Sequence, residues 1–306
     1  MDGKQPTSGD GLINSAGLGI FYMLLGSALL TSSDAVVKWL AQDYPIGQIM
    51  VLRGLFICIP VAIIVWRGGG IDLLRVTNLG GQTARAFCFI ASVFFFLTGL
   101  KFNPLADNIA IAFAGPLFVT ALATPLLGEF VGWRRWMAVL VGFVGILVML
   151  RPSTAGLNWY ALLPLGAAVF GGLRDVLTRR ISATESSVSI LCVSTIAVIA
   201  AGLATAGLGD WRWLTPFDIG LMALTGLLSG TAHYLLIQSF ATGEASLVAP
   251  FKYFSLLWGV LIGALVWGDL PDEGMIAGSV LVVGSGLYIL HREMLRKRAS
   301  QLMLNR

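Results

Sequence analysis

The sequence predicts an all-α integral membrane protein with ten transmembrane helices, arranged as two inverted five-helix repeats with both termini in the cytoplasm. Three observations predict this class: the scarcity of charge, the length of the apolar segments, and a duplication within the chain. The 306 residues are 57% hydrophobic and 12% charged, whereas a soluble domain carries about 25% charged residues. Charge this sparse is typical of a surface that faces lipid. The net charge of +4 comes without a basic patch interleaved with aromatic residues, so we expect no nucleic-acid partner.

Each apolar segment is long enough to cross a bilayer, because a hydrocarbon core about 30 Å thick needs about 20 residues of helix. Helix is expected throughout, since an open strand in lipid leaves backbone groups unpaired. In chain order the segments are 16–40, 47–66, 81–100, 105–127, 132–150, 158–178, 187–208, 216–239, 245–267 and 273–290. The links between them are short and rich in Gly, Pro or charge. We therefore expect a cytoplasmic tail at 1–15, repeats at 16–151 and 158–290, and a basic cytoplasmic tail at 291–306.

Two stretches about 140 residues apart agree without a gap. Residues 100–116 (LKFNPLADNIAIAFAGP) lead through an apolar segment to Gly128-Glu129, and residues 240–254 (FATGEASLVAPFKYF) lead through another to Gly268-Asp269. The beginnings of the two halves also agree, because 34–38 (DAVVK) matches 175–179 (DVLTR). A duplicated hydrophobic unit is the usual sequence trace of a membrane transporter built from repeats.

The Lys and Arg residues predict the orientation, since cytoplasmic loops are enriched in them. With the N-terminus in the cytoplasm, the inside receives Lys4, Arg67, Arg75, Arg85, Arg134, Arg135, Arg179, Arg180, Arg292, Arg296, Lys297, Arg298 and Arg306. The outside receives Lys38, Lys101, Arg151 and Arg212, and Arg53, Arg174 and Lys252 stay at membrane depth. Each repeat has an odd number of spans, so the two homologous repeats must be inverted relative to each other, as in transporters that work by alternating access.

Several motifs resemble one family of transporters. They are WRRW at 133–136, GFVGIL at 142–147, Arg151-Pro152, and ASLVAPFKYFSLLW at 245–258. With these motifs and its two repeats, the chain resembles the EamA family of the drug/metabolite transporter superfamily over residues 17–290. The resemblance implies a multi-pass transporter of the bacterial cytoplasmic (inner) membrane, not an enzyme. It also implies a central cavity lined by the first, third, fourth, sixth, eighth and ninth helices. The family includes amino-acid exporters, S-adenosylmethionine carriers and riboflavin carriers. Lys252 departs from it, because that site is more often neutral or acidic.

Lys252 is the first candidate for contact with a substrate. It lies roughly 12 Å into the ninth span at about 1.5 Å per residue, and a charge at the bilayer centre costs about 2.5–3.5 kcal/mol. The side chain should therefore face a cavity or a partner. It shares one helix face with Ser255, Gly259 and Gly263, which is too small and polar for lipid. A structural ion pair and snorkelling to the inner surface are the alternatives.

Further candidates come from other spans. His233 has a side chain that titrates near neutral pH, so it could carry a coupling proton, or it could hydrogen-bond a neighbouring helix. Arg85 begins a face that includes Ser92, with snorkelling as the alternative. Asn108 suits substrate hydrogen bonding or helix capping, and Arg174 could bind substrate or neutralise Asp175. The expected substrate-binding residues are Lys252, His233, Tyr234, Tyr253, Ser255, Asn108, Arg85, Ser92 and Arg174.

The expected gating or coupling residues are Asp34, Asp175 and Pro250. The two aspartates occupy equivalent positions near opposite membrane faces, which suits an outer and an inner gate. Local pairing with Lys38 and Arg179, four residues further on, is the alternative. Pro250 removes a backbone donor and can bend the ninth helix.

The candidate residues are basic on balance, which favours a small organic substrate that is zwitterionic or bears a carboxylate, such as an amino-acid-like metabolite. The expected function is secondary transport of that metabolite by alternating access, with a proton or a counter-substrate as a further partner and membrane lipid around the helices. A larger metabolite such as S-adenosylmethionine or riboflavin is the alternative, and a polytopic membrane enzyme or a lipid scrambler is more remote. No cofactor or metal is expected. The glycines of Gly142-x-x-Gly145 and Gly274-x-x-x-Gly278 favour contacts within the monomer over a weak homodimer.

Overall fold

The computed structural model describes residues 8–68, 70, 74–127, 132–150, 159–181, 184–207, 211–242 and 249–304. Within them, the α-helices are α1 (Ser8–Leu40), α2 (Ile46–Gly68), α3 (Leu79–Phe102), α4 (Leu105–Ala112), α5 (Gly115–Leu127), α6 (Trp133–Leu150), α7 (Leu162–Ile181), α8 (Ser187–Ala204), α9 (Pro216–Thr242), α11 (Phe254–Trp267) and α12 (Glu273–Leu304). Short 3-10 helices, η2 (Trp159–Ala161) and η3 (Ala249–Tyr253), precede α7 and α11. The motif residues Gly128, Glu129, Arg151 and Pro152 lie outside the described residues.

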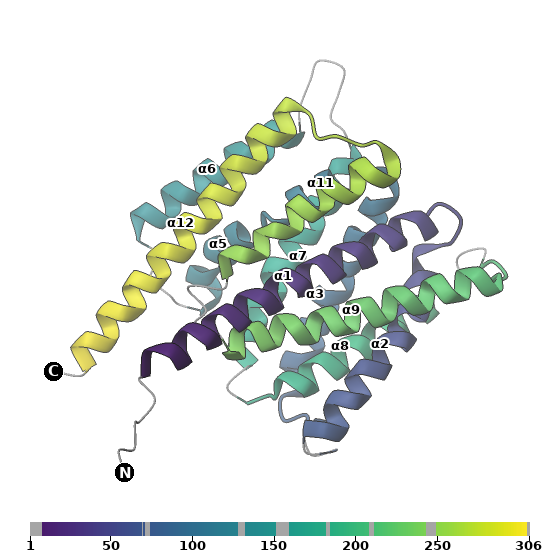
Figure 1. Cartoon of the computed structure of the whole chain (residues 1–306), viewed down its shortest axis with the longest axis horizontal. Helices are drawn as coiled ribbons and strands as arrows, with labels where there is room; N and C mark the ends of the chain where they lie inside the picture. The colour runs from purple at the N-terminus through teal and green to yellow at the C-terminus, as the bar shows by residue number, and fades with distance from the viewer. Residues whose placement is uncertain are drawn as a thin grey trace, which may run out of the picture.

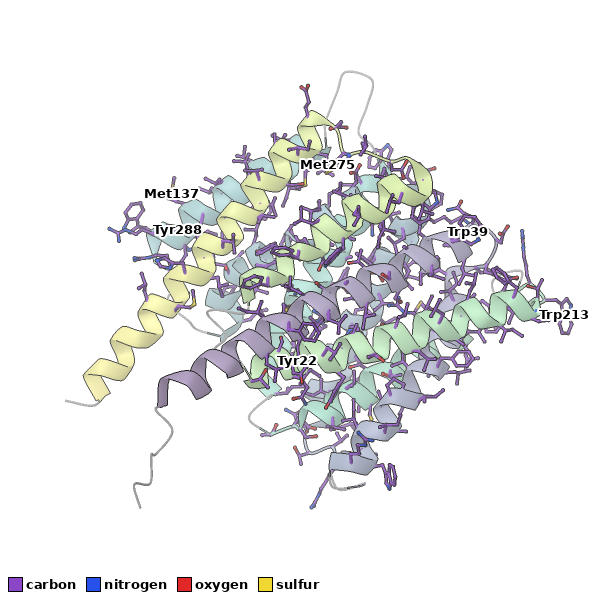
Figure 2. The ribbon with its side chains drawn as sticks, viewed as in Figure 1. Tyr22, Trp39, Met137, Trp213, Met275 and Tyr288 are labelled. Carbon is purple, nitrogen blue, oxygen red and sulfur yellow. The ribbon has the colours of Figure 1, made fainter. Side chains whose placement is uncertain are left out.

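These helices form an elongated bundle whose long axes run broadly alongside one another (Figure 1). Eight of the helical segments are long and apolar enough to cross a membrane, and two shorter apolar segments, Val188–Ala204 and Phe251–Trp267, accompany them. The prediction of an all-α membrane protein with ten helical segments is therefore confirmed, eight of them as candidate spans. The inversion of the repeats and the cytoplasmic position of the termini stay predictions. Outward-facing apolar side chains such as Trp39 and Met137 are 54% and 50% exposed, as lipid contact requires (Figure 2).

The fourth and ninth spans differ from the continuous helices predicted over 105–127 and 245–267. A two-residue turn separates α4 from α5, because Pro116 has no backbone N–H to donate to the Ala112 carbonyl. The Ala114 N–H instead donates to the Ile111 carbonyl at 3.0 Å, which is a 3-10 bond. In the second half, η3 ends at Tyr253, and the α-helix begins one residue later. The two departures fall at matching places in the duplicated sequence.

The tenth helix is longer than its predicted span of 273–290. α12 continues to Leu304, so the described part of the basic segment at 291–306 is a continuation of the helix. Figure 1 shows this end of α12 projecting beyond the rest of the bundle.

Helices of one half pack against helices of the other in a reciprocal pattern. The first helix of each half packs on the third helix of the other half, as α1 does on α9 and α7 on α3. The second helices of the two halves, α2 and α8, pack on each other, and so do the fifth helices, α6 and α12. The interior of the bundle is consequently built from both halves together.

Glycines allow the fifth helices to touch. A Cβ atom added at Gly145 would lie 2.9 Å from the Gly278 carbonyl oxygen, and one added at Gly278 would lie 2.6 Å from the Gly145 carbonyl oxygen. Both distances are too short for a side chain, so the backbones of α6 and α12 meet there. The predicted use of these glycines for a contact within the monomer is confirmed.

Candidate functional site

A buried arginine joins three helices near the centre of α2. The Arg53 Nη2 atom lies 3.5 Å from the Asp34 Oδ1 atom of α1 and donates a hydrogen bond of 2.9 Å to the Ser229 hydroxyl of α9. The side chains of Arg53 and Asp34 are only 12% and 9% exposed. Charges at this depth persist only when they are paired. Arg53, which the sequence left at membrane depth without a partner, is therefore paired, and the alternative that Asp34 pairs with Lys38 is wrong; the gating role of Asp34 stays a prediction.

A second arginine joins the three helices that correspond to these in the other half. Arg85 of α3 donates through Nε to the Thr178 hydroxyl of α7 at 2.7 Å. It also donates through Nη1 to the Ser194 hydroxyl of α8 at 2.5 Å. The guanidinium is therefore held between helices, in place of the snorkelling alternative. Arg53 and Ser194 occupy matching positions in the duplicated sequence. The second helix of a half therefore carries the arginine in the first junction and the serine in the second junction.

Arg174 brings a further positive charge beside Arg85. The Arg174 Nη2 atom lies 2.6 Å from the Asp175 Oδ1 atom, so the neighbouring carboxylate does pair with it. The guanidinium carbons of Arg174 and Arg85 lie 5.6 and 5.9 Å from the ring centre of Phe89, so the two cations share one aromatic ring. Asp175 is 49% exposed, unlike Asp34, its counterpart in the first half.

Lys252 lies close to this group. It belongs to η3, at the end of the chain segment that leads into α11, and its side chain is exposed. The charges of Asp175 and Arg174 both act on the Lys252 amine. Among the described residues the amine has no hydrogen-bond or ion-pair partner, while the Ser255 hydroxyl donates to the Lys252 carbonyl at 2.8 Å. We call Arg85, Arg174, Asp175 and Lys252 the basic cluster.

His233 lies within electrostatic range of Arg53 and of two members of the basic cluster. The charges of Arg53, Arg174 and Lys252 all act on it. Its Nδ1 atom lies 2.7 Å from the Ser229 carbonyl oxygen of its own helix. Since a carbonyl oxygen only accepts, Nδ1 must carry the hydrogen, which leaves Nε2 as the ring atom able to accept a proton or a hydrogen bond.

The breaks in the fourth and ninth spans meet at a pair of aromatic rings. The Phe113 and Tyr253 ring centroids are 5.0 Å apart, and the rings are inclined by 48°. These residues occupy matching positions in the duplicated sequence, and Tyr253 directly follows Lys252. Phe113 was not among the predicted site residues, although the Gly115-Pro116 pair indicated a break beside it.

The remaining predicted binding residues have structural contacts. The Asn108 amide donates to the Phe96 carbonyl at 3.2 Å and ties α4 to α3. The Ser92 hydroxyl donates to the Ala167 carbonyl at 2.9 Å and ties α3 to α7. Tyr234 lies on an exposed stripe of α9 with Leu227 and Ile237. Of Pro250, the structure describes the backbone, which belongs to η3.

Lys38 closes one end of the bundle. Its Nζ atom donates to the Asn103 carbonyl at 2.6 Å, lies 3.9 Å from the Asp269 Oδ2 atom and stands over the Trp267 ring at 5.2 Å. The last turn of α1 is thereby fastened to the α3–α4 link and the α11–α12 link. The side chain of Arg179, its counterpart in the second half, lies outside the described residues.

Two further contacts join chain links near helix ends. One connects the α1–α2 link to the beginning of α9, and the other connects the α7–α8 link to the beginning of α3. The Tyr44 hydroxyl donates to the Asp218 Oδ2 atom at 2.6 Å, which raises the pKa of the Tyr44 phenol because its ionised form would face a carboxylate. At the matching place, the Glu185 Oε1 atom accepts from the Thr77 hydroxyl at 2.7 Å and the Asn78 N–H at 2.5 Å. These bonds and one from Gln82 lower the pKa of Glu185 to about 2. Tyr44 matches Glu185 in the duplicated sequence, and Thr77 matches Asp218, so the hydroxyl and the carboxylate are exchanged between the two contacts.

Comparisons with known proteins identify the family. Residues 17–151 match the EamA-like transporter family. A riboflavin transporter of Rhizobium johnstonii is 32% identical over 204 residues, which are 66% of this chain and 67% of that protein. The chain belongs to the EamA-like transporter family. It is therefore a membrane transporter and not an enzyme.

Other transporters match over more of the chain. An S-adenosylmethionine uptake transporter of Rickettsia felis is 28% identical and covers 92% of this chain and 97% of its own length. A pseudopaline exporter of Pseudomonas aeruginosa is 26% identical and covers 87% of this chain and 93% of its own length. A solved crystal structure with 20% identity and a TM-score of 0.60 covers 90% of this chain and 95% of its own, and shares the fold.

Proposed function

We propose that this EamA-like transporter moves a small, carboxylate-bearing or zwitterionic metabolite across the bacterial cytoplasmic membrane by alternating access, and that the substrate binds at the basic cluster. The observation that carries the proposal is the surplus of positive charge there. Within the described residues, Arg174 pairs with a single carboxylate, Asp175, whose charge also acts on two further cations, Arg85 and Lys252.

An anionic group on the substrate would offset this surplus. Placing an unpaired charge at membrane depth costs free energy, so a site with extra cations gains when a carboxylate enters. Arg85 is already fixed by Thr178 and Ser194, whereas Lys252 has no such anchor in the described part of the chain. Lys252 is therefore the cation best placed to change its contacts when substrate arrives. Asp175, which is half-exposed, would accept the ammonium group of a zwitterion.

The unequal exposure of the matching aspartates supports alternating access. Asp34 lies buried behind the contacts of Lys38, while Asp175 is accessible. We infer a state that is closed at the Lys38 end and open at the Asp175 end. The reciprocal packing of α1 on α9 and α7 on α3 supports the inverted repeats. With both termini in the cytoplasm, as the distribution of Lys and Arg favours, the open end faces the cytoplasm.

S-adenosylmethionine is a specific second candidate within the same proposal. It combines a carboxylate with an ammonium group, a sulfonium group and an aromatic purine, so its carboxylate is the part that would offset the cations of the basic cluster. The Phe113 and Tyr253 rings adjoin Lys252 and offer an aromatic surface for such a ring. S-adenosylmethionine uptake transporters also match this chain over nearly its whole length.

The test is transport by purified protein in liposomes. Thermal stability is first measured with amino acids, organic acids, S-adenosylmethionine and riboflavin, since a ligand at 100 times its Kd stabilises the folded state by about 2.7 kcal/mol. Radiolabelled counterflow of each stabilising compound then follows. Lys252→Ala should weaken the binding of the stabilising compound at least about tenfold, which is about 1.4 kcal/mol. Arg67→Ala removes an exposed charge at the end of α2 and is the matched control. Unchanged counterflow by Lys252→Ala, or stabilisation by uncharged compounds alone, would refute the proposal.

A further inference from the structure

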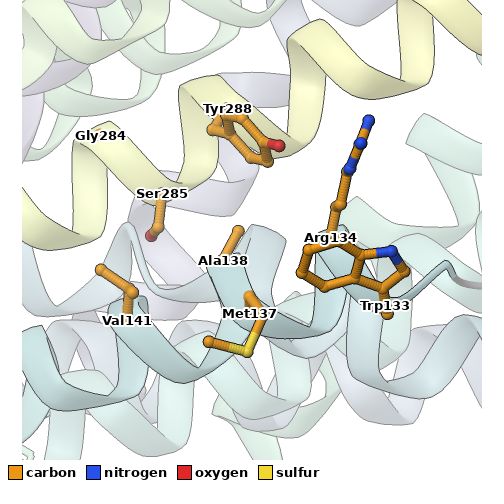
Figure 3. A pocket seen from close by; sticks show the side chains of 8 residues that line it. All are labelled: Trp133, Arg134, Met137, Ala138, Val141, Gly284, Ser285 and Tyr288. Atoms are coloured by element: carbon orange, nitrogen blue, oxygen red, sulfur yellow. The ribbon is translucent and has the colours of Figure 1, made fainter.

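A groove runs between α6 and α12 on the outer face of the bundle, near the beginning of α6. Its volume is about 370 Å³, and it is lined by Trp133, Arg134, Met137, Ala138, Val141, Gly284, Ser285 and Tyr288 (Figure 3). That volume falls within the range of about 300–1,000 Å³ that is common for ligand sites. We propose that this groove binds one anionic phospholipid, with the phosphate at Arg134 and an acyl chain along the groove. This inference is independent of the proposed transport function.

The shape of the groove follows from the packing of the two helices. α6 and α12 touch at Gly145 and Gly278, and the groove lies between that contact and the first turn of α6. Its lining includes the small residues Ala138, Gly284 and Ser285. The Ser285 hydroxyl donates to the Val282 carbonyl of its own helix at 2.8 Å, so it presents no free donor to the groove. From Trp133 to Val141 the groove extends along about 12 Å of helix at 1.5 Å per residue. An apolar trough of this form suits an acyl chain.

The mouth of the groove carries the charge and the aromatic rings of a headgroup site. Figure 3 shows Arg134, Trp133 and Tyr288 gathered at this end. Trp133 and Tyr288 are 71% and 43% exposed, and such rings are enriched at the level of the lipid headgroups. The Arg134 guanidinium carbon lies 5.5 Å from the Trp133 ring centre, which orients it. In the described part of the chain, no carboxylate lies within 4.0 Å of Arg134, so its charge is available to a phosphate.

The occupant comes from the bilayer and not from the transport path. Met137 and Val141, which form one wall, are 50% and 43% exposed on the outer surface. Neither Lys252 nor Arg174 lines the groove. A cation at headgroup depth attracts anionic lipid by roughly 1 kcal/mol per Lys or Arg, which favours phosphatidylglycerol over a lipid with no net charge.

The test is lipid retention by the full chain in native mass spectrometry. Delipidated protein is mixed with phosphatidylglycerol, phosphatidylcholine, diacylglycerol or inorganic phosphate. We expect one tightly retained phosphatidylglycerol, a loss of retention of about fivefold with Arg134→Gln, and a larger loss with Gly284→Leu, which fills the groove. A Cβ added at Gly284 meets nothing within 4 Å, so this variant leaves the internal packing intact.

Matched controls make the result decisive. Arg135→Gln removes the adjacent charge outside the groove lining, and Gly220→Leu adds a side chain at another open glycine, on α9. Both should retain phosphatidylglycerol as the wild type does, and melting temperatures establish that every variant is folded. The proposal is overturned if phosphatidylcholine is retained equally, if inorganic phosphate displaces the lipid, if Arg135→Gln matches Arg134→Gln, or if Gly284→Leu has no effect.

Discussion

The rings of Phe113 and Tyr253 lie against each other, with centroids 5.0 Å apart, where the fourth span of one half meets the ninth span of the other. Their positions match in the duplicated sequence, so each half supplies one ring. Phe113 also contacts both hydrophobic clusters of the bundle, one around α6 and α12 and one around α1, α2 and α3. A contact shared in this way holds the two halves together at their centre.

Phe113→Ala should destabilise the whole bundle. A buried Phe→Ala change costs about 3–5 kcal/mol, and Phe113 is half-buried, so we expect about 3 kcal/mol. The melting temperature in detergent measures the effect. Phe87→Ala is the control, because Phe87 is 66% exposed on the same kind of apolar surface. Equal melting temperatures for the two variants would contradict a central role for the ring pair.

Asp34→Asn should destabilise the protein far more than Asp175→Asn. Removing one partner of a buried ion pair leaves the other charge uncompensated and costs about 3–5 kcal/mol, and Arg53 would be left in this position. Asp175 is 49% exposed, where ion pairs contribute about 1 kcal/mol or less. The second change Arg53→Met should recover part of the loss. Thermal melting of the single and double variants tests this, and a double variant that is less stable than Asp34→Asn would contradict it.

The Glu185 contacts should make stability depend on pH in an acidic window. The folded pKa of Glu185 is about 2, below its ordinary value of 4.5. The carboxylate therefore stabilises the folded state above pH 4.5, and this contribution disappears as the pH falls from 4.5 toward 2. Glu185→Gln should show a shallower fall of melting temperature over that window than the wild type. Parallel curves for the two proteins would argue against the assignment.

Gly278→Val should disrupt the contact between α6 and α12, since its side chain would meet the Gly145 carbonyl. We expect a lower melting temperature and poor monodispersity in size-exclusion chromatography. Gly284→Val places the same side chain on the same helix in open space and should keep the wild-type profile. If the two variants behave alike, the close approach of α6 and α12 is not required.

Thiol labelling should report which end of the transporter is open. In a protein whose Cys58, Cys88 and Cys192 are replaced by serine, Asp175→Cys should react with a membrane-impermeant maleimide added from the cytoplasmic side. Asp34→Cys should stay protected, because that side chain is only 9% exposed. Adding saturating substrate should change the two rates in opposite directions. Labelling of position 175 from the outside would reverse the proposed orientation.

Hydropathy predicted the spans well, because the length of an apolar segment is set by the bilayer. The ends of α2 and α3 fall within two residues of the predicted limits. The break between α4 and α5 was missed, although Pro116 follows a glycine and has no backbone N–H to donate. Composition outweighed that local signal, since both sides of the break are apolar.

Side-chain partners were harder to predict than helices. Asp34 and Lys38 have the spacing of a helical pair, which contributes about 0.2–0.5 kcal/mol. Each instead finds a tertiary partner: Asp34 pairs with Arg53, and Lys38 donates to the Asn103 carbonyl. The hydroxyl partners of Arg53 and Arg85 come from the opposite half of the chain. Tyr44 and Glu185 were missed because they lie in polar links, although the duplication offset pairs them. Lys252 was singled out because a lone charge in an apolar segment is a strong signal, and its contact with substrate stays a prediction.

The two arginine junctions differ in when the ribosome can complete them. Arg53 can meet Asp34 as soon as α1 and α2 are made, because both belong to the first half. Arg85 finds Thr178 and Ser194 only after α7 and α8 are synthesised, roughly 110 residues later. At about 5–20 residues per second, the nascent chain carries an unsatisfied guanidinium near the membrane for several seconds or longer. Biogenesis of this transporter therefore passes through an intermediate in which Arg85 has no partner. Slow translation prolongs this intermediate, and loss of the second half makes it permanent.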